Sequence, residues 1–191
     1  MHLVPTSLPG VVIVEPAVFS DDRGWFSESY NEVRFNTALQ DIGLPGTRRF
    51  VQDNHSCSKA GVLRGLHYQL PPHAQGKLVR VVKGAAYDVA VDIRPGSPGF
   101  GQWVGVELSA DNQRQLWVPE GFAHAFMALQ DDTHFLYKTT DFYAKDCERS
   151  IRWDDPAIGI RWPLAAGLTT PLVAPKDAAA PLLAAADLPA T

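Results

Sequence analysis

A succession of short β-type segments, separated by turn residues, is the feature that most constrains the fold of this chain. In residues 87–94 (YDVAVDIR), apolar side chains occupy every second position from Tyr87 to Ile93. A period of two is typical of a strand. Further runs of strand length are GKLVRVVKG, QWVGVELS, RQLWVP, HAFMALQ and HFLYKTTDFY, with turn sequences such as RPGSPGFG and SADNQ between them. Short strands at this spacing predict an all-β barrel or sandwich.

A few short helices are predicted at its periphery. One has Asn31 as its cap, and its buried face would carry Phe35, Leu39 and Ile42. A second short helix is predicted from Ala178 to Ala186, in the Ala- and Pro-rich tail, where it would lie on the barrel.

Length and composition indicate one globular domain over residues 1–191. The chain is 46% hydrophobic and 20% charged, a balance that suits a packed core. There is no internal repeat and no interdomain linker, so the Ala- and Pro-rich segment 164–191 is expected to pack on the barrel. Cys57 and Cys147 lie 90 positions apart, which is neither a disulfide framework nor a zinc-binding spacing.

Charge and hydropathy exclude some partners. The net charge of −4 argues against nucleic acid and against an anionic membrane surface, so any anion site must be local. No run approaches the roughly 20 apolar residues of a membrane helix, and the first residues lack the pattern of a signal peptide. A soluble, cytoplasmic protein is therefore expected.

The motif RGLHYQ carries the first candidate for chemistry, His67. An ordinary packed histidine is the alternative interpretation. On a regular strand, His67 and Arg64 would face opposite sides, because their separation is odd. Both side chains can reach one pocket only if Gly65 permits a β-bulge.

A metal site is not predicted. Small metal-binding β-barrels usually present two histidines one residue apart and a glutamate, followed by a later histidine. PEGFAH supplies the later one, His124, but RGLHYQ has a single histidine. Two imidazoles fall short of the three or four ligands that a transition metal needs. His124 is then either a core residue or a polar group of the pocket.

A pocket with His, Lys, Tyr and Arg has two possible uses. It can bind an anionic ligand, or it can remove a proton next to a carbonyl group, with His as base, cations stabilising the enolate, and Tyr as acid. The second use requires a carboxylate that fixes which imidazole nitrogen is the base. Residue types alone do not identify that carboxylate.

A series of motifs then resembles one family over about Pro9 to Leu183. They are FSDDRGWFSESYN, VQDNHS, GVLRGLHYQ, QGKLVR, DVAVDIR, SPGFGQWVGVELSADNQRQLWVPEGFAHAF, FLYKTT, WDDPAIGIRWP and PKDAAAPLL. In this order they are similar to the dTDP-4-dehydrorhamnose 3,5-epimerases, isomerases with a cupin-like jelly-roll fold. The resemblance implies epimerisation of dTDP-4-dehydro-6-deoxy-D-glucose at C3 and C5, without cofactor, to dTDP-4-dehydro-L-rhamnose for dTDP-L-rhamnose biosynthesis. Both carbons flank the C4 ketone, so one base and one acid could serve twice.

By this resemblance, four residues are catalytic. His67 matches the base, and Asp177 matches its carboxylate partner. Tyr137 in FLYK matches the proton donor, although a strand-face aromatic is its alternative interpretation. Lys77 in QGK matches a lysine near the C4 oxygen, where its charge would stabilise the enolate.

The same resemblance implies a set of substrate-binding residues and a homodimer. Tyr143 matches an aromatic residue that stacks on thymine. Further nucleotide or sugar contacts are matched by Gln52, Asn54, Arg64, Lys77, His124, Glu148 and Lys176. Arg23 and Glu28 lie in the 19–30 segment, which in this family reaches into a neighbouring subunit's pocket. A surface strand is the alternative for that segment.

Three departures from the family pattern have consequences. Ala125 stands where glycine is usual and would narrow the space beside His124. The tail reads APKD where SxKD is common, and the stretch before it is longer, which bears on the assignment of Asp177. Trp25 replaces a frequent phenylalanine and should be neutral.

Rival functions on the same fold are a single-position epimerase or ketoisomerase on this dTDP-sugar, and a non-catalytic sugar-nucleotide binding cupin. The combination of His67, Tyr137 and Lys77 argues against the binding protein, because a binder needs no acid and no base. It does not separate one epimerisation from two.

Overall fold

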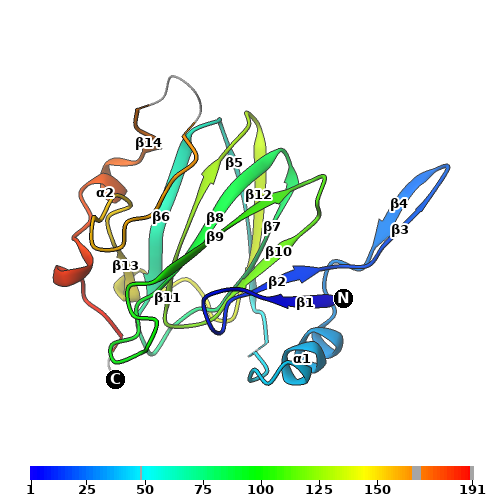
Figure 1. The fold of residues 1–191 in the computed structure, drawn as a ribbon, viewed down its shortest axis with the longest axis horizontal. Coiled ribbons are helices and arrows are strands. Elements are labelled where there is room, and N and C mark those ends of the chain that lie inside the picture. The colour runs from blue at the N-terminus through cyan, green and yellow to red at the C-terminus, as the bar shows by residue number, and fades with distance from the viewer. Residues whose placement is uncertain (48, 165–168, 190–191) are drawn as a thin grey trace.

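Two β-sheets packed face to face form the body of the protein (Figure 1). The computed structural model describes residues 1–47, 49–164 and 169–189. One sheet has the order β1 (His2–Pro5), β2 (Val12–Glu15), β10 (Gln115–Val118), β7 (Lys77–Lys83), β12 (Thr133–Thr139) and β5 (Gln52–Ser58). The other has the order β13 (Glu148–Ser150), β6 (Val62–Gln69), β11 (Phe122–Ala128), β8 (Ala85–Asp92) and β9 (Trp103–Ser109). The predicted all-β sandwich is confirmed.

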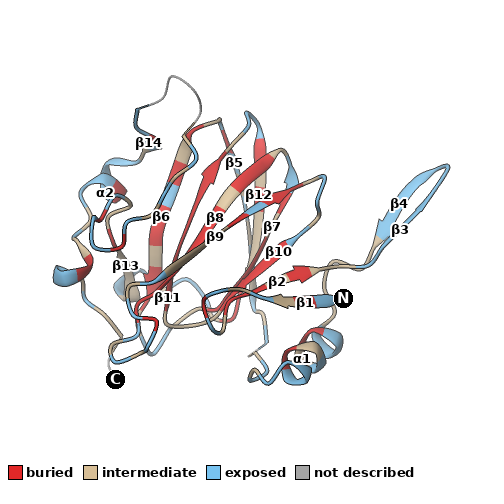
Figure 2. Cartoon of the chain, in the orientation of Figure 1, coloured by how far each residue is buried: buried red, intermediate tan, exposed pale blue. Residues whose placement is uncertain are grey.

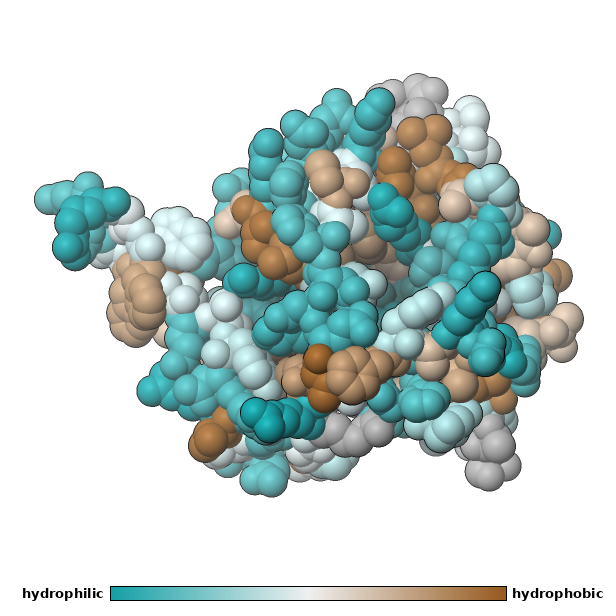
Figure 3. Space-filling model, turned by 180° about the vertical axis from the view of Figure 1, so that it is seen from behind, coloured by the Kyte–Doolittle hydropathy of each residue, from teal (hydrophilic) through white to brown (hydrophobic). Residues whose placement is uncertain are grey.

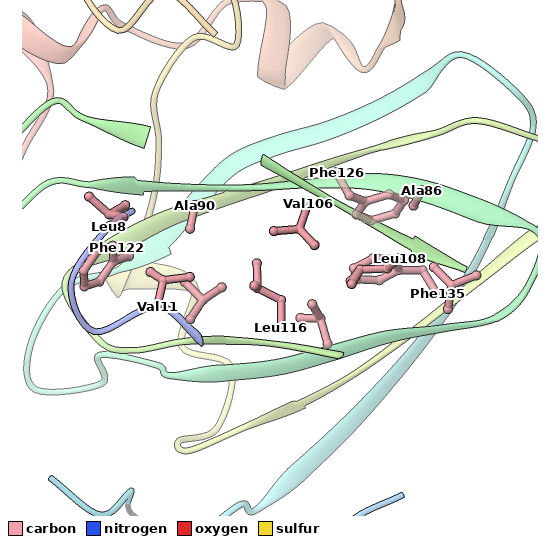
Figure 4. Packing of buried hydrophobic residues seen from close by; sticks show 13 residues of the cluster. Leu8, Val11, Ala86, Ala90, Val106, Leu108, Leu116, Phe122, Phe126 and Phe135 are labelled. Atoms are coloured by element: carbon pink, nitrogen blue, oxygen red, sulfur yellow. The ribbon is translucent and has the colours of Figure 1, made fainter. Parts of the chain in front are cut away.

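The two sheets enclose the main hydrophobic core (Figure 4). Leu116 and Phe135 are fully buried there, and the rings of Phe126 and Phe135 stack with centroids 3.9 Å apart. Each such side chain contributes about 1.5–3 kcal/mol by leaving water. Figure 2 shows the buried residues concentrated on the strands of the two sheets.

The alternation in residues 87–94 separates two environments. Val89 and Val91 pack in a second cluster, together with Leu183 from the C-terminal segment, whereas Ala90 packs in the core between the sheets. The described part of that segment thus covers the outer face of the β6–β8 sheet. It includes β14 (Leu172–Val173), which pairs in parallel with β6, then α2 (Pro175–Ala178) and the 3₁₀ turn η2 (Leu183–Ala185).

The helix predictions have two outcomes. α1 (Glu32–Asp41) is confirmed: the Asn31 side chain accepts a hydrogen bond from the Arg34 amide at 3.1 Å, and Phe35 and Leu39 are buried. Ile42 lies at its end and is 37% exposed, so it does not belong to the buried face. The predicted continuous helix from Ala178 to Ala186 is wrong.

In its place, α2 ends at Ala178 and η2 begins five residues later. Pro181 lies between them, and a proline inside a helix removes a backbone donor and clashes with the preceding turn. A further 3₁₀ turn, η1 (Lys145–Cys147), precedes β13. Among the described residues, no helix is long and apolar enough to cross a membrane.

A hairpin of β3 (Val18–Asp21) and β4 (Gly24–Ser27) projects from the body (Figures 1 and 3). Its aromatic residues are unusually exposed, with Phe19 at 64%, Trp25 at 63% and Phe26 at 69%. Exposed apolar groups of this size are typical of a contact surface.

Candidate active site

A cavity of about 390 Å³ opens beside β6 and lies against both sheets. The predicted site residues Arg64, His67, Lys77, His124, Tyr137, Lys176 and Asp177 all line it. A smaller cavity, of about 270 Å³, shares His67, Lys77 and Tyr137 with the first. Its other lining residues include Gln52, Asn54, Tyr143 and Glu148. The structure therefore brings together all the predicted site residues except Arg23 and Glu28.

A β-bulge at Gly65 brings Arg64 and His67 to the same cavity. In the pairing of β6 with β11, His67 faces His124 and Arg64 faces Phe126, so three residue steps on β6 match two on β11. Gly65 has φ +124, and a Cβ there would lie 2.6 Å from the carbonyl oxygen of His124. Only glycine fits this position without strain. The bulge resolves the odd spacing that a regular strand would have imposed.

His67 is paired with Asp177 from α2. Its Nε2 lies 2.7 Å from Oδ1 of Asp177, and the Gly65 amide donates to Oδ2 at 3.1 Å. Burial raises the pKa of Asp177, but the hydrogen bond and charge of His67, together with the Gly65 amide and Lys176, bring that pKa below its usual value. The carboxylate is therefore ionised and can only accept, so Nε2 of His67 carries the proton. Nδ1 remains as the basic nitrogen.

Lys77 and Tyr137 supply a cation and a neutral phenol. Burial lowers the pKa of Lys77 to about 8, although the charges of Asp88 and Glu148 raise it. Its Nζ donates to the His67 carbonyl at 3.3 Å. Burial raises the pKa of the Tyr137 hydroxyl, and the positive charge of Arg64 opposes part of this effect. At neutral pH the lysine is mostly protonated and the tyrosine keeps its proton.

His124 forms a second histidine–carboxylate pair, with Asp88 from β8. The His124 Nε2 atom lies 2.9 Å from Oδ2 of Asp88, whose side chain is fully buried. His124 is thus a polar group at the cavity, one of the two alternatives left by the sequence. No group of three His, Cys, Asp or Glu among the described residues could hold a metal ion.

Ala125 corrects one expectation. The Cβ of Ala125 points toward Gly65, where any added side chain would clash with it. Ala125 packs in the cluster under the C-terminal segment. It therefore faces away from the cavity that His124 lines, and the prediction that it narrows the space beside His124 is wrong.

The polar residues of the smaller cavity are connected to one another. The Tyr143 hydroxyl donates to Glu148 Oε2 at 3.1 Å, and Lys176 Nζ lies 2.5 Å from the same oxygen. The Gln52 amide accepts from the Tyr143 backbone nitrogen at 3.1 Å and donates to Asn54 Oδ1 at 3.0 Å. Both ends of the Gln52 amide are thus used within the protein.

Arg23 and Glu28 lie outside the cavity of their own chain. Arg23 is on the projecting hairpin, where its guanidinium pairs with Asp21, and its side chain is 89% exposed. Glu28 accepts hydrogen bonds from Asn31 at 3.2 Å and from Arg34 at 3.0 Å.

Two buried polar residues near the site, Asp88 and Gln69, are not among the residues predicted from the sequence. Asp88 belongs to the alternating run 87–94, and its position, between apolar residues that face the other way, directs it inward. Gln69, two residues after His67, is 6% exposed and bonds three backbone groups. A polar residue in a strand whose two faces are both apolar is the sequence pattern that could have identified Asp88 and Gln69.

A histidine held by an ionised aspartate, a cation and a neutral phenol around one cavity define an acid–base site inside a β-sandwich, the kind that moves protons next to a carbonyl group. Comparison with known proteins identifies the family. The model of the dTDP-4-dehydrorhamnose 3,5-epimerases matches residues 5–185. The chain belongs to this family.

Individual relatives agree with it over nearly their full length. The dTDP-4-dehydrorhamnose 3,5-epimerase of Shigella flexneri is 56% identical over 178 residues, 93% of each chain. That of Pseudomonas aeruginosa is 55% identical over 187 residues, 98% of each.

Among solved structures, the dTDP-6-deoxy-D-glucose-3,5-epimerase of Legionella pneumophila, in complex with dTDP-4-keto-L-rhamnose, is 48% identical. The match has a TM-score of 0.90 and covers 100% of this chain and 98% of that one. The predicted cupin-like jelly roll is confirmed. The protein is an isomerase, with the 3,5-epimerase function of dTDP-L-rhamnose biosynthesis.

Proposed function

We propose that His67 removes the C3 and C5 protons of dTDP-4-dehydro-6-deoxy-D-glucose, and that Tyr137 returns a proton from the opposite face to give dTDP-4-dehydro-L-rhamnose. The observation that carries this proposal is the 2.7 Å contact of His67 with the ionised Asp177 at the cavity. Asp177 fixes the imidazole and stabilises the imidazolium that forms when Nδ1 takes a proton. No cofactor is required, because the C4 ketone acidifies both carbons.

Lys77 would stabilise the enolate between the two proton transfers. Negative charge then develops on the C4 oxygen, and a cation held in a buried site is most effective there. The buried amine is poised for this role, since its pKa of about 8 leaves it charged at neutral pH and able to respond to a nearby oxyanion. His124, whose other nitrogen bonds Asp88, would contact the sugar from the same side of the cavity.

The nucleotide would occupy the smaller cavity. Tyr143 has an exposed ring on which thymine can stack, and base stacking of this kind contributes about 1–3 kcal/mol per base. The substrate's diphosphate would be bound by cations at the cavity rim, Arg64 and Lys176, with Asn54 as a neutral contact. These local charges suffice although the chain as a whole is acidic.

The test of the reaction is hydrogen exchange in deuterated water. Incubation with dTDP-4-dehydro-6-deoxy-D-glucose should place deuterium at both C3 and C5, with no cofactor added and no loss after chelation. NMR distinguishes the two carbons. Exchange at a single carbon would indicate a single-position epimerase, and no exchange at all would favour a binding protein.

We also propose a homodimer in which the 19–30 segment of each chain completes the other's site. The projecting hairpin (Figure 1) exposes three aromatic rings and carries Arg23, which does not line the two cavities that contain His67. A shared site can be tested by complementation. Arg23→Ala and His67→Asn variants, each inactive alone, should regain about a quarter of wild-type activity when mixed and allowed to exchange subunits. A mixture that stays inactive would contradict the shared site.

We infer a cytoplasmic location. Cys57 and Cys147 are both free in the structure, which suits a reducing compartment. Fractionation of cells that express the chain with a small tag tests this inference.

A further inference from the structure

The loop that carries Tyr143, residues 141–144, is held by glutamine side chains from three parts of the chain. The backbone of each of its four residues forms one hydrogen bond with a glutamine side chain. These bonds are Gln75 Nε2 to the Asp141 carbonyl (2.8 Å), Gln69 Nε2 to the Phe142 carbonyl (3.2 Å), the Tyr143 amide to Gln52 Oε1 (3.1 Å), and the Ala144 amide to Gln69 Oε1 (2.8 Å). We call Gln52, Gln69 and Gln75 the glutamine clamp.

Gln69 is the centre of this clamp. It is 6% exposed, and its amide nitrogen also donates to the His73 carbonyl at 2.6 Å. Only a carboxamide of this length can accept from one loop amide while donating to two carbonyls, because a carboxylate has no proton to donate. Gln69 follows His67 by two residues on β6, so the strand that presents the base also fixes the loop.

Other hydrogen bonds of the loop come mainly from residues close to it in the sequence: Thr139 Oγ1 donates to the Asp141 carbonyl at 2.9 Å, and the amides of Cys147 and Glu148 donate to the Ala144 carbonyl. The clamp adds bonds from distant parts of the chain.

The loop lies between β12, which ends at Thr139, and η1, which begins at Lys145, and the rings of Phe142 and Tyr143 are 61% and 55% exposed. An exposed loop without strand pairing samples many conformations unless side chains fix its backbone. Fixing it in the free protein removes an ordering cost from ligand binding.

We propose that the glutamine clamp is a positioning device that presents the Tyr143 ring as a preformed stacking surface for the nucleobase. This inference rests on the proposed stacking role of Tyr143. It assigns Gln69 and Gln75, which also line the smaller cavity, a part in nucleotide affinity that is exerted through the loop. It also gives Gln52 a positioning role, since both ends of its amide are engaged inside the protein.

A double-mutant cycle tests the proposal with calorimetry of dTDP binding. Gln69→Met keeps the side-chain length and removes all three hydrogen bonds, so dTDP should bind about tenfold more weakly. In steady state KM should rise while kcat stays within about twofold, because the loop takes no part in proton transfer. In a Tyr143→Ala background, Gln69→Met should add almost nothing, since the surface it positions is gone. Gln102→Met, at an exposed glutamine, is the control and should not alter binding.

The possible results separate the inference from the function on which it rests. Equal weakening by Gln69→Met with and without Tyr143, or no weakening, would overturn the positioning role while the stacking role stands. Unchanged affinity in Tyr143→Ala alone would remove the stacking role and the inference with it. Should Gln69→Met fail to fold, Gln75→Met removes only the Asp141 bond at a half-buried position and should show the same dependence on Tyr143.

Discussion

Two histidines face each other across β6 and β11, and each has its own carboxylate, yet they differ in exposure. The side chain of His67 is 31% exposed and its partner Asp177 comes from a segment 110 residues away. The side chain of His124 is 8% exposed and its partner Asp88 is fully buried on the next strand. A His–Asp pair alone therefore does not define a base. Access of the free nitrogen to substrate separates the two.

Replacing each histidine by asparagine is the strongest test of this difference. His67→Asn should abolish both C–H exchange and turnover, a loss of at least about 10³-fold, because no other group starts the reaction. His124→Asn should cost no more than about 10²-fold, as expected for one lost polar contact to the oxyanion or sugar. Exchange followed by NMR measures both. Equal losses in the two variants would end the distinction.

The two carboxylates should separate in the same way. Asp177→Asn removes the charge that stabilises the imidazolium and favours the wrong tautomer, so activity should fall about 10³- to 10⁴-fold, close to the His67 variant. An Asp177→Asn enzyme with near wild-type turnover would show that Asp177 is only a charge on the tail. Thermal unfolding of the variant checks that the C-terminal segment still packs.

Tyr137→Phe should divide exchange from product formation. The base, Lys77 and the binding contacts remain, so C–H exchange should persist at a reduced rate. Net epimerised product should fall further, by about 10²-fold or more, since the general acid is lost. Exchange and product measured side by side by NMR give the ratio. A proportional loss of both would mean that Tyr137 is not the acid.

Much of the fold could be predicted from local sequence, and the exceptions have local causes. Period-two alternation identified the strand regions, because one face of each strand must be buried. α1 was predicted from its cap and its apolar face. The prediction of the second helix was wrong because an Ala-rich composition favours a helix only where packing supports it and no proline interrupts it. Pro181 lies inside residues 178–186.

The site was predictable only in part, because it depends on contacts between distant segments. The bulge at Gly65 decides whether Arg64 and His67 face one cavity, and strand periodicity alone gives the opposite answer. Asp177 came from family resemblance, since no local pattern links it to His67. Asp88 was overlooked as a partner because an aspartate in an alternating strand can face water or a cavity, and only the packed sheets show which.

The smallest expected effect is a pH shift through Asp88. Lys77 must be protonated to stabilise the enolate, so kcat/KM should fall as the pH rises through its pKa of about 8. The charge of Asp88 raises that pKa, as Glu148 does to a lesser extent. Asp88→Asn removes the larger of the two negative charges that raise the pKa of Lys77. That pKa should therefore fall further, and the basic limb of the kcat/KM profile should move to lower pH.

The pH dependence of kcat/KM for wild type and Asp88→Asn measures the displacement. Asp111→Asn removes the same charge from an exposed turn and should leave the limb in place. A limb that moves to higher pH, or equally in both variants, would show that Lys77 does not set it. A displacement confined to Asp88→Asn would give the buried pair its function: the carboxylate beside His124 serves the lysine, while the one beside His67 serves the base.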